Sequence, residues 1–444
     1  MAPRILVTGA TGFIGSHLAR RLLQEHPLGP DAELVLVVRD PTRLSPALRE
    51  GARLLVGDLR QADRFREEIA ETTWCFHIAA EADYRGGSAT VENNVESTRM
   101  LLDLLAEAPG LERFVFTSSI GAIDRHPNDP CRRPLTEDDP AHPLTPYGRS
   151  KWACEERIRR SPLPWSILRP TWVYGPGMRK TSHIRTFIRM VARRHPVTKF
   201  AFPGRVSLIH VTDLVDALLL LAKREEAVGE VYFAADGHPR SLGEIFREIG
   251  RYLGIRAGTI PFPRPFIRMM RALRPHLPFA AQNLFSDLLS ASNEKLVRLS
   301  FTPQVPFAEG LLGTIHWDAR EAMPPQERKW SLVTGAGSGI GKAVAQRLYA
   351  AGDRLLLVDC NGEALDREAR RLEARAFPLD LARPDALETL LQTIEREGIE
   401  LHRLVNAAGI GIRGTVAELG FEEQQRVIAV NVTALLFLSR FALR

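Results

Sequence analysis

A tyrosine and a lysine lie four residues apart in TPYGRSKWACEERI, residues 145–158. On a helix this spacing puts Tyr147 and Lys151 on one face. A free tyrosine has a pKa of about 10, but a neighbouring ammonium stabilises the phenolate and lowers that pKa. Such a tyrosine can give a proton to a carbonyl oxygen as a hydride arrives, or remove one from an alcohol. The alternative is an ordinary surface pair, which any helix can contain.

Two other segments favour the catalytic interpretation. One is a strand followed by hydroxyl side chains, and the other contains a glycine turn. RFVFTSSIGAI, from Arg113, predicts a strand after which Ser119 could hold a substrate oxygen. RILVTGATGFIGSHLARRLL, from Arg4, predicts a strand, a tight glycine turn and an amphipathic helix whose N-terminus can bind phosphates. The glycines allow the turn, the approach of a pyrophosphate and close packing of the helix. We therefore predict a dinucleotide site formed by Gly9, Thr11, Gly12, Phe13, Ile14 and Gly15.

The next strand, ELVLVVRD, predicts which dinucleotide is bound. An acidic residue at this strand end usually binds the ribose 2′-OH of NAD. Here Arg39 precedes Asp40, and Arg43 follows within a turn. A guanidinium suits a 2′-phosphate better than a hydroxyl, so we predict a preference for NADPH. Two alternatives remain: Arg39 is a solvated surface residue, or Asp40 turns inward and binds the 2′-OH.

Further strands alternate with helices over the first 320 residues. LLVGDL ends at Asp58 and Leu59, which could cover the adenine, and WCFHIAA brings the small Ala79 beside the cofactor. Helical stretches such as VESTRMLLDLLAEA lie between the strands. Alternation of this kind predicts an α/β fold with a doubly wound parallel sheet, a Rossmann unit.

These motifs together resemble the extended branch of the short-chain dehydrogenase/reductase family, over residues 3–320. They stand as TGATGFIG (8–15), GDL (57–59), HIAA (77–80), NNV (93–95), FTSS (116–119), YGRSK (147–151), RPTWVYGPG (169–177), IHVTDLVDA (209–217) and LSFTPQVPFAEGLLGTIHW (299–317). The resemblance implies Ser119, Tyr147 and Lys151 as the catalytic set, with Ser119 rather than Ser118 facing the substrate. Tyr147 and Lys151 are also expected to contact the cofactor. Asn94 is expected to support the lysine through a water.

The subgroup is less clearly indicated. VVRDPTRL is similar to dihydroflavonol reductases, and the whole unit resembles 3β-hydroxysteroid dehydrogenases, which favours an NAD(P)H-dependent reductase or dehydrogenase of a fairly lipophilic ketone, aldehyde or alcohol. The alternative is a nucleotide-sugar epimerase or dehydratase with tightly bound NAD. Many of those carry an asparagine before VYGP, where this chain has Thr171 and Trp172. An indole suits a less polar substrate. A non-catalytic cofactor-binding scaffold is a third alternative.

Residues 178–208 and 236–300 are expected to form a small substrate-binding subdomain. Within it, PFPRPFIRMMRALRPHLPFAAQNLF mixes apolar residues with arginines. This segment could be a lid for a lipophilic substrate or a membrane-surface helix. Alternatively it is an ordinary amphipathic helix packed on the domain. Its prolines predict several short pieces rather than one helix.

A second unit begins after the charged segment WDAREAMPPQERK, which predicts a linker (residues 321–328) between residues 1–320 and 329–444. TGAGSGIG repeats the glycine turn, and DRLLLVDC ends at an aspartate without an adjacent arginine, which favours NAD(H). The predicted cofactor residues are Gly335, Gly339, Ile340, Gly341, Asp359, Asp380 and Asn406. The unit resembles the compact branch of the same family, but no Tyr-x-x-x-Lys follows Asn431. We expect a Rossmann unit without its catalytic half, either as part of a longer two-enzyme chain or as a natural non-catalytic module.

Composition excludes several other classes. The 444 residues are 45% hydrophobic and 25% charged, with a net charge of +6. The arginines are scattered, so no nucleic-acid site is expected. Four separated cysteines without a CxxC pair argue against disulfides and against a metal site. No apolar run reaches the ~18 residues of a membrane span. We expect a cytoplasmic enzyme with a small-molecule carbonyl or alcohol substrate, and a homodimer is compatible with the sequence.

Overall fold

The computed structural model describes residues 2–81, 88–126, 129, 131, 133–323, 328–414 and 417–443. The chain divides into two compact units. The first comprises Met1–Thr186, His195–Arg247 and Ala257–Phe307, and the second comprises Phe187–Arg194, Glu248–Arg256 and Ala308–Arg444. The division into domains at residues 320 and 329 stays a prediction.

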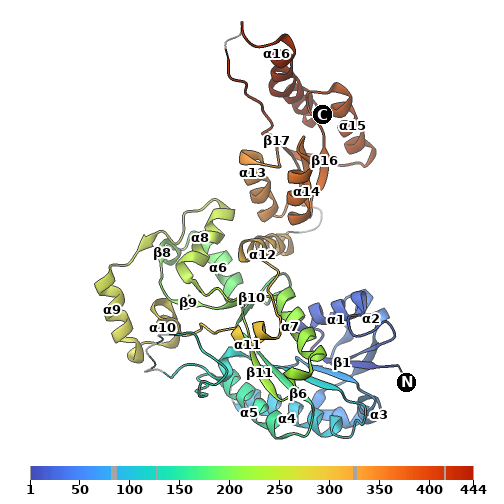
Figure 1. Ribbon diagram of the computed structural model, residues 1–444, viewed down its shortest axis with the longest axis vertical. Coiled ribbons are helices and arrows are strands. Elements are labelled where there is room, and N and C mark those ends of the chain that lie inside the picture. The colour runs from blue at the N-terminus through green and yellow to red at the C-terminus, as the bar shows by residue number, and fades with distance from the viewer. Residues whose placement is uncertain are drawn as a thin grey trace. The chain divides into compact units, whose positions relative to one another are not determined.

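The first unit is built on a seven-stranded sheet in which every pairing is parallel (Figure 1). Its strand order is β11-β6-β5-β4-β1-β2-β3. The bounds are β1 (Arg4–Thr8), β2 (Glu33–Val38), β3 (Arg53–Val56), β4 (Trp74–His77), β5 (Arg113–Thr117), β6 (Trp165–Pro170) and β11 (Glu230–Ala234). The predicted α/β class and doubly wound parallel sheet are confirmed. The order reverses between β1 and β4, where such sheets bind ligands at their carboxyl ends.

Helices cover both faces of this sheet, which explains its continuous apolar strands. On one face α1 (Phe13–Glu25) and α7 (Val211–Lys223) pack on Ile5 and Val7 of β1. On the other face α4 (Ser88–Leu105) and α5 (Pro146–Arg160) form a core with Leu6 and Phe114. Side chains alternate across a strand, so β1 contributes to both cores.

Short elements follow β6 in the sequence. They include β7 (Trp172–Tyr174), α6 (His183–Ala192), β8 (Phe200–Ala201), β9 (Arg205–Val206), β10 (Leu208–His210), β12 (Arg240–Ser241), α8 (Leu242–Leu253), β13 (Ile260–Pro261), α9 (Arg264–Ala272), α10 (Phe279–Phe285) and α11 (Glu294–Arg298). The proline-rich segment after Pro261 is divided into short helices, as its sequence predicts. Helix α12 (Phe307–Ala322) extends into the predicted linker because no helix-breaking residue precedes Pro324. Residues 324–327 of that linker lie outside the described residues.

The second unit contains a four-stranded parallel sheet of order β16-β15-β14-β17. Its elements are β14 (Trp330–Thr334), α13 (Gly339–Ala350), β15 (Arg354–Asp359), α14 (Gly362–Arg371), β16 (Arg375–Pro378), α15 (Pro384–Arg396), β17 (Leu401–Asn406), α16 (Phe421–Ile428), the π-helical turn η8 (Ala429–Ala434) and α17 (Leu435–Ala442). The central strands meet α15 in an apolar core that includes Leu332, Leu356 and Leu390.

The last helical run, Phe421–Ala442, joins α16, η8 and α17 into 22 continuous helical residues. Its most apolar 18-residue window has a mean hydropathy of 1.2, and most of that window is unburied. By length and composition alone it is long and apolar enough to cross a membrane. The sequence showed no such run because charged and polar residues, including Arg426 and Arg440, interrupt it.

A buried ion cluster holds α5 on the sheet of the first unit. The carboxylate of Glu155 accepts hydrogen bonds from Arg169 Nε (2.9 Å) and Nη2 (2.7 Å). Ser118 Oγ, directly after β5, donates to the same carboxylate at 2.5 Å. Arg169 and Glu155 are almost completely inaccessible to solvent. The cluster therefore connects α5, β5 and β6.

Substituting Arg169→Met should lower the free energy of unfolding of the first unit by about 3–5 kcal/mol, because it leaves a buried carboxylate without its main partner. Arg160→Met, on the exposed side of α5, should cost less than about 1 kcal/mol. Adding Glu155→Gln to Arg169→Met should recover part of the loss, since no unpaired buried charge remains: Arg159, which also pairs with Glu155 at 3.0 Å, is partly exposed. Urea unfolding of the full chain measures all three, and equal stabilities for the two arginine variants would contradict this account.

Candidate active site

One cavity of about 910 Å³ opens at the carboxyl edge of the large sheet. The loops that follow β1, β2, β3, β4 and β5 line it, together with the start of α5 and residues 170–173 after β6. Every site residue predicted in the first unit lies on its wall: Gly9, Thr11, Gly12, Phe13, Ile14, Gly15, Arg39, Asp58, Leu59, Ala79, Asn94, Ser119, Tyr147 and Lys151. The fold thus brings together residues that are up to 142 positions apart in the sequence.

In the glycine turn, neighbouring backbone atoms leave no space for a side chain at Gly9 or Gly15. Gly9 has φ +79°, and a Cβ there would lie 2.7 Å from the backbone nitrogen of Ala79. A Cβ at Gly15 would lie 2.2 Å from the carbonyl oxygen of Gly9. Helix α1 starts at Phe13 with Gly12 as a cap that has no side chain to occupy the free N–H groups. These features fit the pyrophosphate of a dinucleotide.

Two arginines lie near the expected ribose position, and the carboxylate of Glu81 is 3.9 Å from Arg39 Nη1. Arg39 and Arg43 both line the cavity, and the Arg39 side chain is 67% exposed. Asp40 instead caps the short helix η1 (Pro41–Arg43), where its Oδ1 accepts hydrogen bonds from Thr42 Oγ1 (2.6 Å) and Thr42 N (3.0 Å). These bonds hold the pKa of Asp40 below its usual value. The aspartate is therefore an anion committed to its own loop.

Helix α5 reaches the end of β5 through a contact between two glycines. A Cβ at Gly148 would lie 2.2 Å from the carbonyl oxygen of Gly121. Thr145 caps the helix by accepting a hydrogen bond from Gly148 N at 3.0 Å. Because the backbones touch, Tyr147 at the start of α5 is held close to Ser119. Ser119 Oγ accepts a hydrogen bond from Gly121 N at 3.2 Å, which leaves its hydroxyl proton for another acceptor.

Lys151 is buried, and its ammonium lies inside the protein at the end of β5. Its Nζ donates to the carbonyl oxygen of Thr117 at 2.7 Å and lies 4.5 Å from the ring centroid of Phe116. The distance from Nζ to the ring centroid of Tyr147 is 6.0 Å. Burial lowers the pKa of Lys151 to about 8. The ammonium is thus poorly solvated and close enough to favour a negative charge on the tyrosine.

Asn94 makes hydrogen bonds that lead to Tyr147. Its Oδ1 accepts from Glu81 N at 2.8 Å, and its Nδ2 donates to Ser150 Oγ at 3.0 Å. Ser150 Oγ donates in turn to the carbonyl oxygen of Tyr147 at 2.8 Å. Asn94 therefore positions the first turn of α5, and its support of Lys151 through a water stays a prediction.

Aromatic rings form the wall after β6. The Trp172 indole stacks on His183 with ring centroids 4.3 Å apart and an angle of 12° between the planes. Both residues line the cavity, and burial lowers the pKa of His183. Thr171 Oγ1 donates to the carbonyl oxygen of Ala234 at 3.0 Å, so that hydroxyl is engaged with β11. This part of the wall therefore combines a stacked indole and imidazole with polar residues.

Asp124 is a cavity residue that the sequence analysis missed. Its side chain is 3% exposed, and its Oδ2 accepts a hydrogen bond from Leu144 N at 3.0 Å. Burial raises its pKa to about 7. The only signal in the sequence is an acid that directly follows the apolar segment IGAI. A carboxyl group with this pKa can act as an acid and as a base at neutral pH.

Because the folded pKa of Asp124 exceeds its unfolded pKa of 3.8, the folded protein loses stability as pH rises from about 4 to about 7. The loss amounts to about 1.4 kcal/mol for each unit between the two pKa values. Asp124→Asn keeps an acceptor for Leu144 N and should be the more stable protein at pH 8, while the difference vanishes near pH 4. Urea unfolding at both pH values checks this. A variant that is less stable at pH 8 than at pH 4, relative to wild type, would contradict it.

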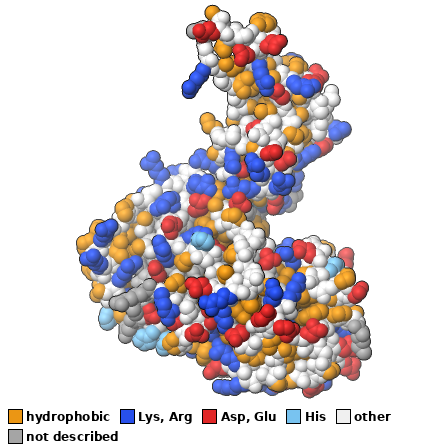
Figure 2. Space-filling view, in the orientation of Figure 1, with side chains coloured by type: hydrophobic (Ala, Val, Ile, Leu, Met, Phe, Trp, Pro, Cys, Tyr) orange, Lys and Arg blue, Asp and Glu red, His pale blue; other side chains and the backbone are white. Residues whose placement is uncertain are grey.

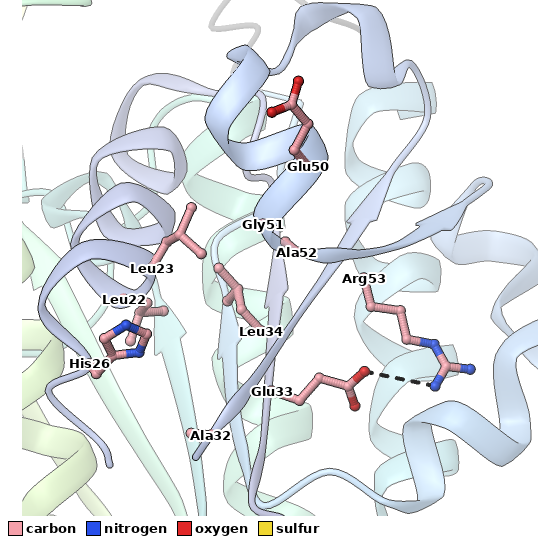
Figure 3. Close-up of a pocket in the computed structure, with 10 residues that line it drawn as sticks. All are labelled: Leu22, Leu23, His26, Ala32, Glu33, Leu34, Glu50, Gly51, Ala52 and Arg53. Carbon is pink, nitrogen blue, oxygen red and sulfur yellow. Dashed lines mark ion pairs between the residues drawn. The ribbon is translucent and has the colours of Figure 1, made fainter. Parts of the chain in front are cut away.

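A second cavity, of about 390 Å³, lies near the start of strands β2 and β3 (Figure 3). Its charged residues are partly committed already, since Glu33 pairs with Arg4 (2.8 Å) and lies 3.9 Å from Arg53. This is the amino edge of the sheet, opposite to the edge where open α/β sheets bind ligands. We assign no site to it.

The second unit repeats the glycine turn. Gly335 has φ +66°, and a Cβ at Gly341 would lie 2.1 Å from the carbonyl oxygen of Gly335. Asp359 Oδ2 accepts a hydrogen bond from Gly337 N at 2.9 Å. The other predicted residues are placed as follows: Gly339 and Ile340 begin α13, Asp380 lies 3.0 Å from Arg426 Nη2, and Asn406 Nδ2 donates to Ser439 Oγ at 3.3 Å. Their cofactor role stays a prediction.

Comparison with known proteins assigns the two sets of glycine-turn motifs to two families. Residues 5–235 match the NAD dependent epimerase/dehydratase family, and residues 329–444 match short chain dehydrogenase. The chain is 28% identical to a UDP-glucose 4-epimerase of Vibrio cholerae, over 59% of this chain and 80% of that protein. It is 24% identical to a dihydroflavonol 4-reductase of Hordeum vulgare, over 70% of this chain and 95% of that protein.

Among solved structures, MoeE5 in complex with UDP-glucose and NAD is similar, with a TM-score of 0.56 and 27% identity, over 72% of this chain and 100% of that one. The match to the first family extends over slightly more than half of the sequence. The chain belongs to the NAD dependent epimerase/dehydratase family and is an NAD(P)-dependent enzyme that acts on CH–OH or C=O groups.

Proposed function

We propose that the first unit is a nucleotide-sugar epimerase or dehydratase. The observation that carries the proposal is the single cavity on which the glycine turn, Ser119, Tyr147 and Lys151 meet. The relatives favour this interpretation over reduction of a lipophilic ketone, because a UDP-glucose 4-epimerase and a UDP-glucose complex are among the proteins that the chain resembles. The individual roles of the site residues are part of the proposal.

In this proposal a bound nicotinamide dinucleotide supplies and takes up hydride. Tyr147 Oη removes a proton from the sugar hydroxyl and returns one to the carbonyl oxygen. Lys151 stabilises the phenolate from below, and Ser119 donates a hydrogen bond to the same oxygen. Dehydration removes a proton from the carbon beside the ketone and adds one to the departing hydroxyl, so that water leaves. It therefore requires a further acid–base group, and Asp124 is available on the same wall with a pKa of about 7. Asn94 and Ser150 hold the first turn of α5.

A reductase is the second candidate, and two observations favour it. Trp172 and His183 form a stacked aromatic pair on the cavity wall, and the Hordeum vulgare relative is a dihydroflavonol 4-reductase. A reductase consumes one NAD(P)H per product, whereas an epimerase returns the hydride and keeps its cofactor. Measuring the net consumption of NAD(P)H therefore distinguishes the two candidate functions.

The cofactor preference of each unit follows from its charges. Arg39 and Arg43 line the first cavity while Asp40 is committed to Thr42, which supports NADP(H) there. In the second unit Asp359 has no arginine beside it in the sequence, which supports NAD(H). A homodimer and a cytoplasmic location also stay predictions.

Tyr147→Phe should reduce turnover by about 10²–10⁴-fold, because general acid–base catalysis is lost, while the affinity for cofactor stays within about threefold. Tyr232→Phe, on β11 and off the cavity wall, is the matched control and should retain wild-type turnover. Equal turnover in the two variants would refute the role of Tyr147.

The assay incubates purified protein with UDP-glucose or dTDP-glucose and follows the sugar by NMR and the cofactor by absorbance at 340 nm. The proposal expects a new epimer or a 4-keto-6-deoxy sugar without net consumption of added NAD(P)H. Oxidation of NADPH by aromatic or steroid ketones, with no change in either sugar nucleotide, would identify the reductase instead.

Arg39→Ala should weaken NADPH binding by about 10–100-fold, because a charge-assisted contact to the 2′-phosphate contributes about 1.5–3 kcal/mol. Binding of NADH should be nearly unchanged. Arg49→Ala, on α2 (Pro46–Gly51) and outside the cavity, controls for loss of charge, and any contribution of the second unit is the same in both variants. Calorimetric dissociation constants for NADPH that are the same in the Arg39→Ala and Arg49→Ala variants would contradict the preference.

A further inference from the structure

Helix α9 (Arg264–Ala272) lies on the surface of the first unit and contains no buried residue. Its inner side is held by a cluster of phenylalanines. Phe266 stacks on Phe262 with ring centroids 5.5 Å apart, and both contact Phe285, at 5.8 and 5.2 Å. Arg271 Nε also donates to the carbonyl oxygen of Phe285 at 2.8 Å. The helix is therefore anchored, and its outer face does not depend on those contacts.

The outer face of α9 carries two parallel stripes. Pro265, Met269 and Leu273 recur every four residues, so they line up along the helix; Met269 is 49% exposed and Leu273 is 45% exposed. Arg264 and Arg268 form an adjacent exposed stripe; Arg271 is exposed as well, but its Nε is bonded to Phe285. Ile260 in β13 adds a further exposed apolar side chain. Figure 2 shows hydrophobic and basic side chains side by side over the lobe that carries α9 at the left of Figure 1.

The charge of this face is not compensated locally. Residues 257–286 contain four arginines and no aspartate or glutamate. Arg274 is buried, whereas the three arginines of α9 form no ion pair with any residue that the structure describes. An apolar stripe beside unpaired arginines matches the acyl boundary and the phosphates of an anionic bilayer.

We propose that α9 binds the surface of a membrane that contains anionic phospholipid, with Met269 and Leu273 inserted at the headgroup boundary and Arg264 and Arg268 on lipid phosphates. The helix has nine residues and lies parallel to the bilayer rather than across it. The proposal is independent of the reaction catalysed in the cavity.

The test is flotation of the full chain with 100-nm vesicles of phosphatidylcholine containing 30% phosphatidylglycerol, or of phosphatidylcholine alone. Wild type should bind the anionic vesicles at least tenfold more strongly. Arg264→Gln with Arg268→Gln should weaken that binding by roughly 30-fold, since each arginine near an anionic surface contributes about a fivefold factor. Met269→Ser with Leu273→Ser should weaken it by at least about tenfold. Thermal unfolding and dinucleotide binding should not change, because all four side chains are exposed.

Two matched controls keep the outcome specific to α9. Leu436→Ser with Phe437→Ser removes exposed apolar residues of α17, and Arg193→Gln with Arg194→Gln removes exposed charge elsewhere. Both should bind like wild type. The proposal is overturned if wild type does not float with anionic vesicles, if the α17 variant rather than the α9 variants loses binding, or if the α9 arginines retain the protein on heparin but not on vesicles, which would indicate an acidic macromolecule.

Discussion

The buried carboxylate of Glu155 determines where the reactive groups of the first unit lie. It receives two hydrogen bonds from Arg169 of β6, one from Ser118, the neighbour of Ser119, and one from Arg159 of its own helix. Glu155 lies on α5, one turn after Lys151 and two after Tyr147. One charged group thus connects the strand end that carries the serine to the helix that carries the tyrosine and lysine. The glycine contact between Gly121 and Gly148 then brings the two backbones together.

Much of this arrangement could be read from the sequence because it is encoded locally. The glycine turn between a strand and a helix, and the four-residue spacing of Tyr147 and Lys151, each lie within one short segment. Parallel topology then places the carboxyl ends of the strands at one edge, so residues from separate motifs must converge there. The predicted sheet and the shared cavity follow from these two facts.

Other features depend on partners that sequence spacing does not reveal. Asp124 acquires its raised pKa from burial beneath the loop of Leu144, and an isolated acid in a sequence does not indicate burial. The sequence is compatible with two directions of the Asp40 side chain, and its hydrogen bonds with Thr42 determine which one it adopts. Asn94 contacts Ser150 across 56 positions of sequence. Long-range packing, rather than local pattern, decides each of these cases.

Strand β11, which pairs with β6 at the edge of the large sheet, has a consequence for how the chain is made. Residues 165–170 leave the ribosome well before residues 230–234, and parallel pairing cannot be replaced by a local hairpin. At 5–20 residues per second, on the order of 3–12 s pass before the partner strand is synthesised. During that interval the edge of β6 exposes unpaired backbone groups, and Leu168 lacks the side chains of α7 that cover it in the folded protein. This edge is where a nascent chain would be most open to chaperones or to association with another copy.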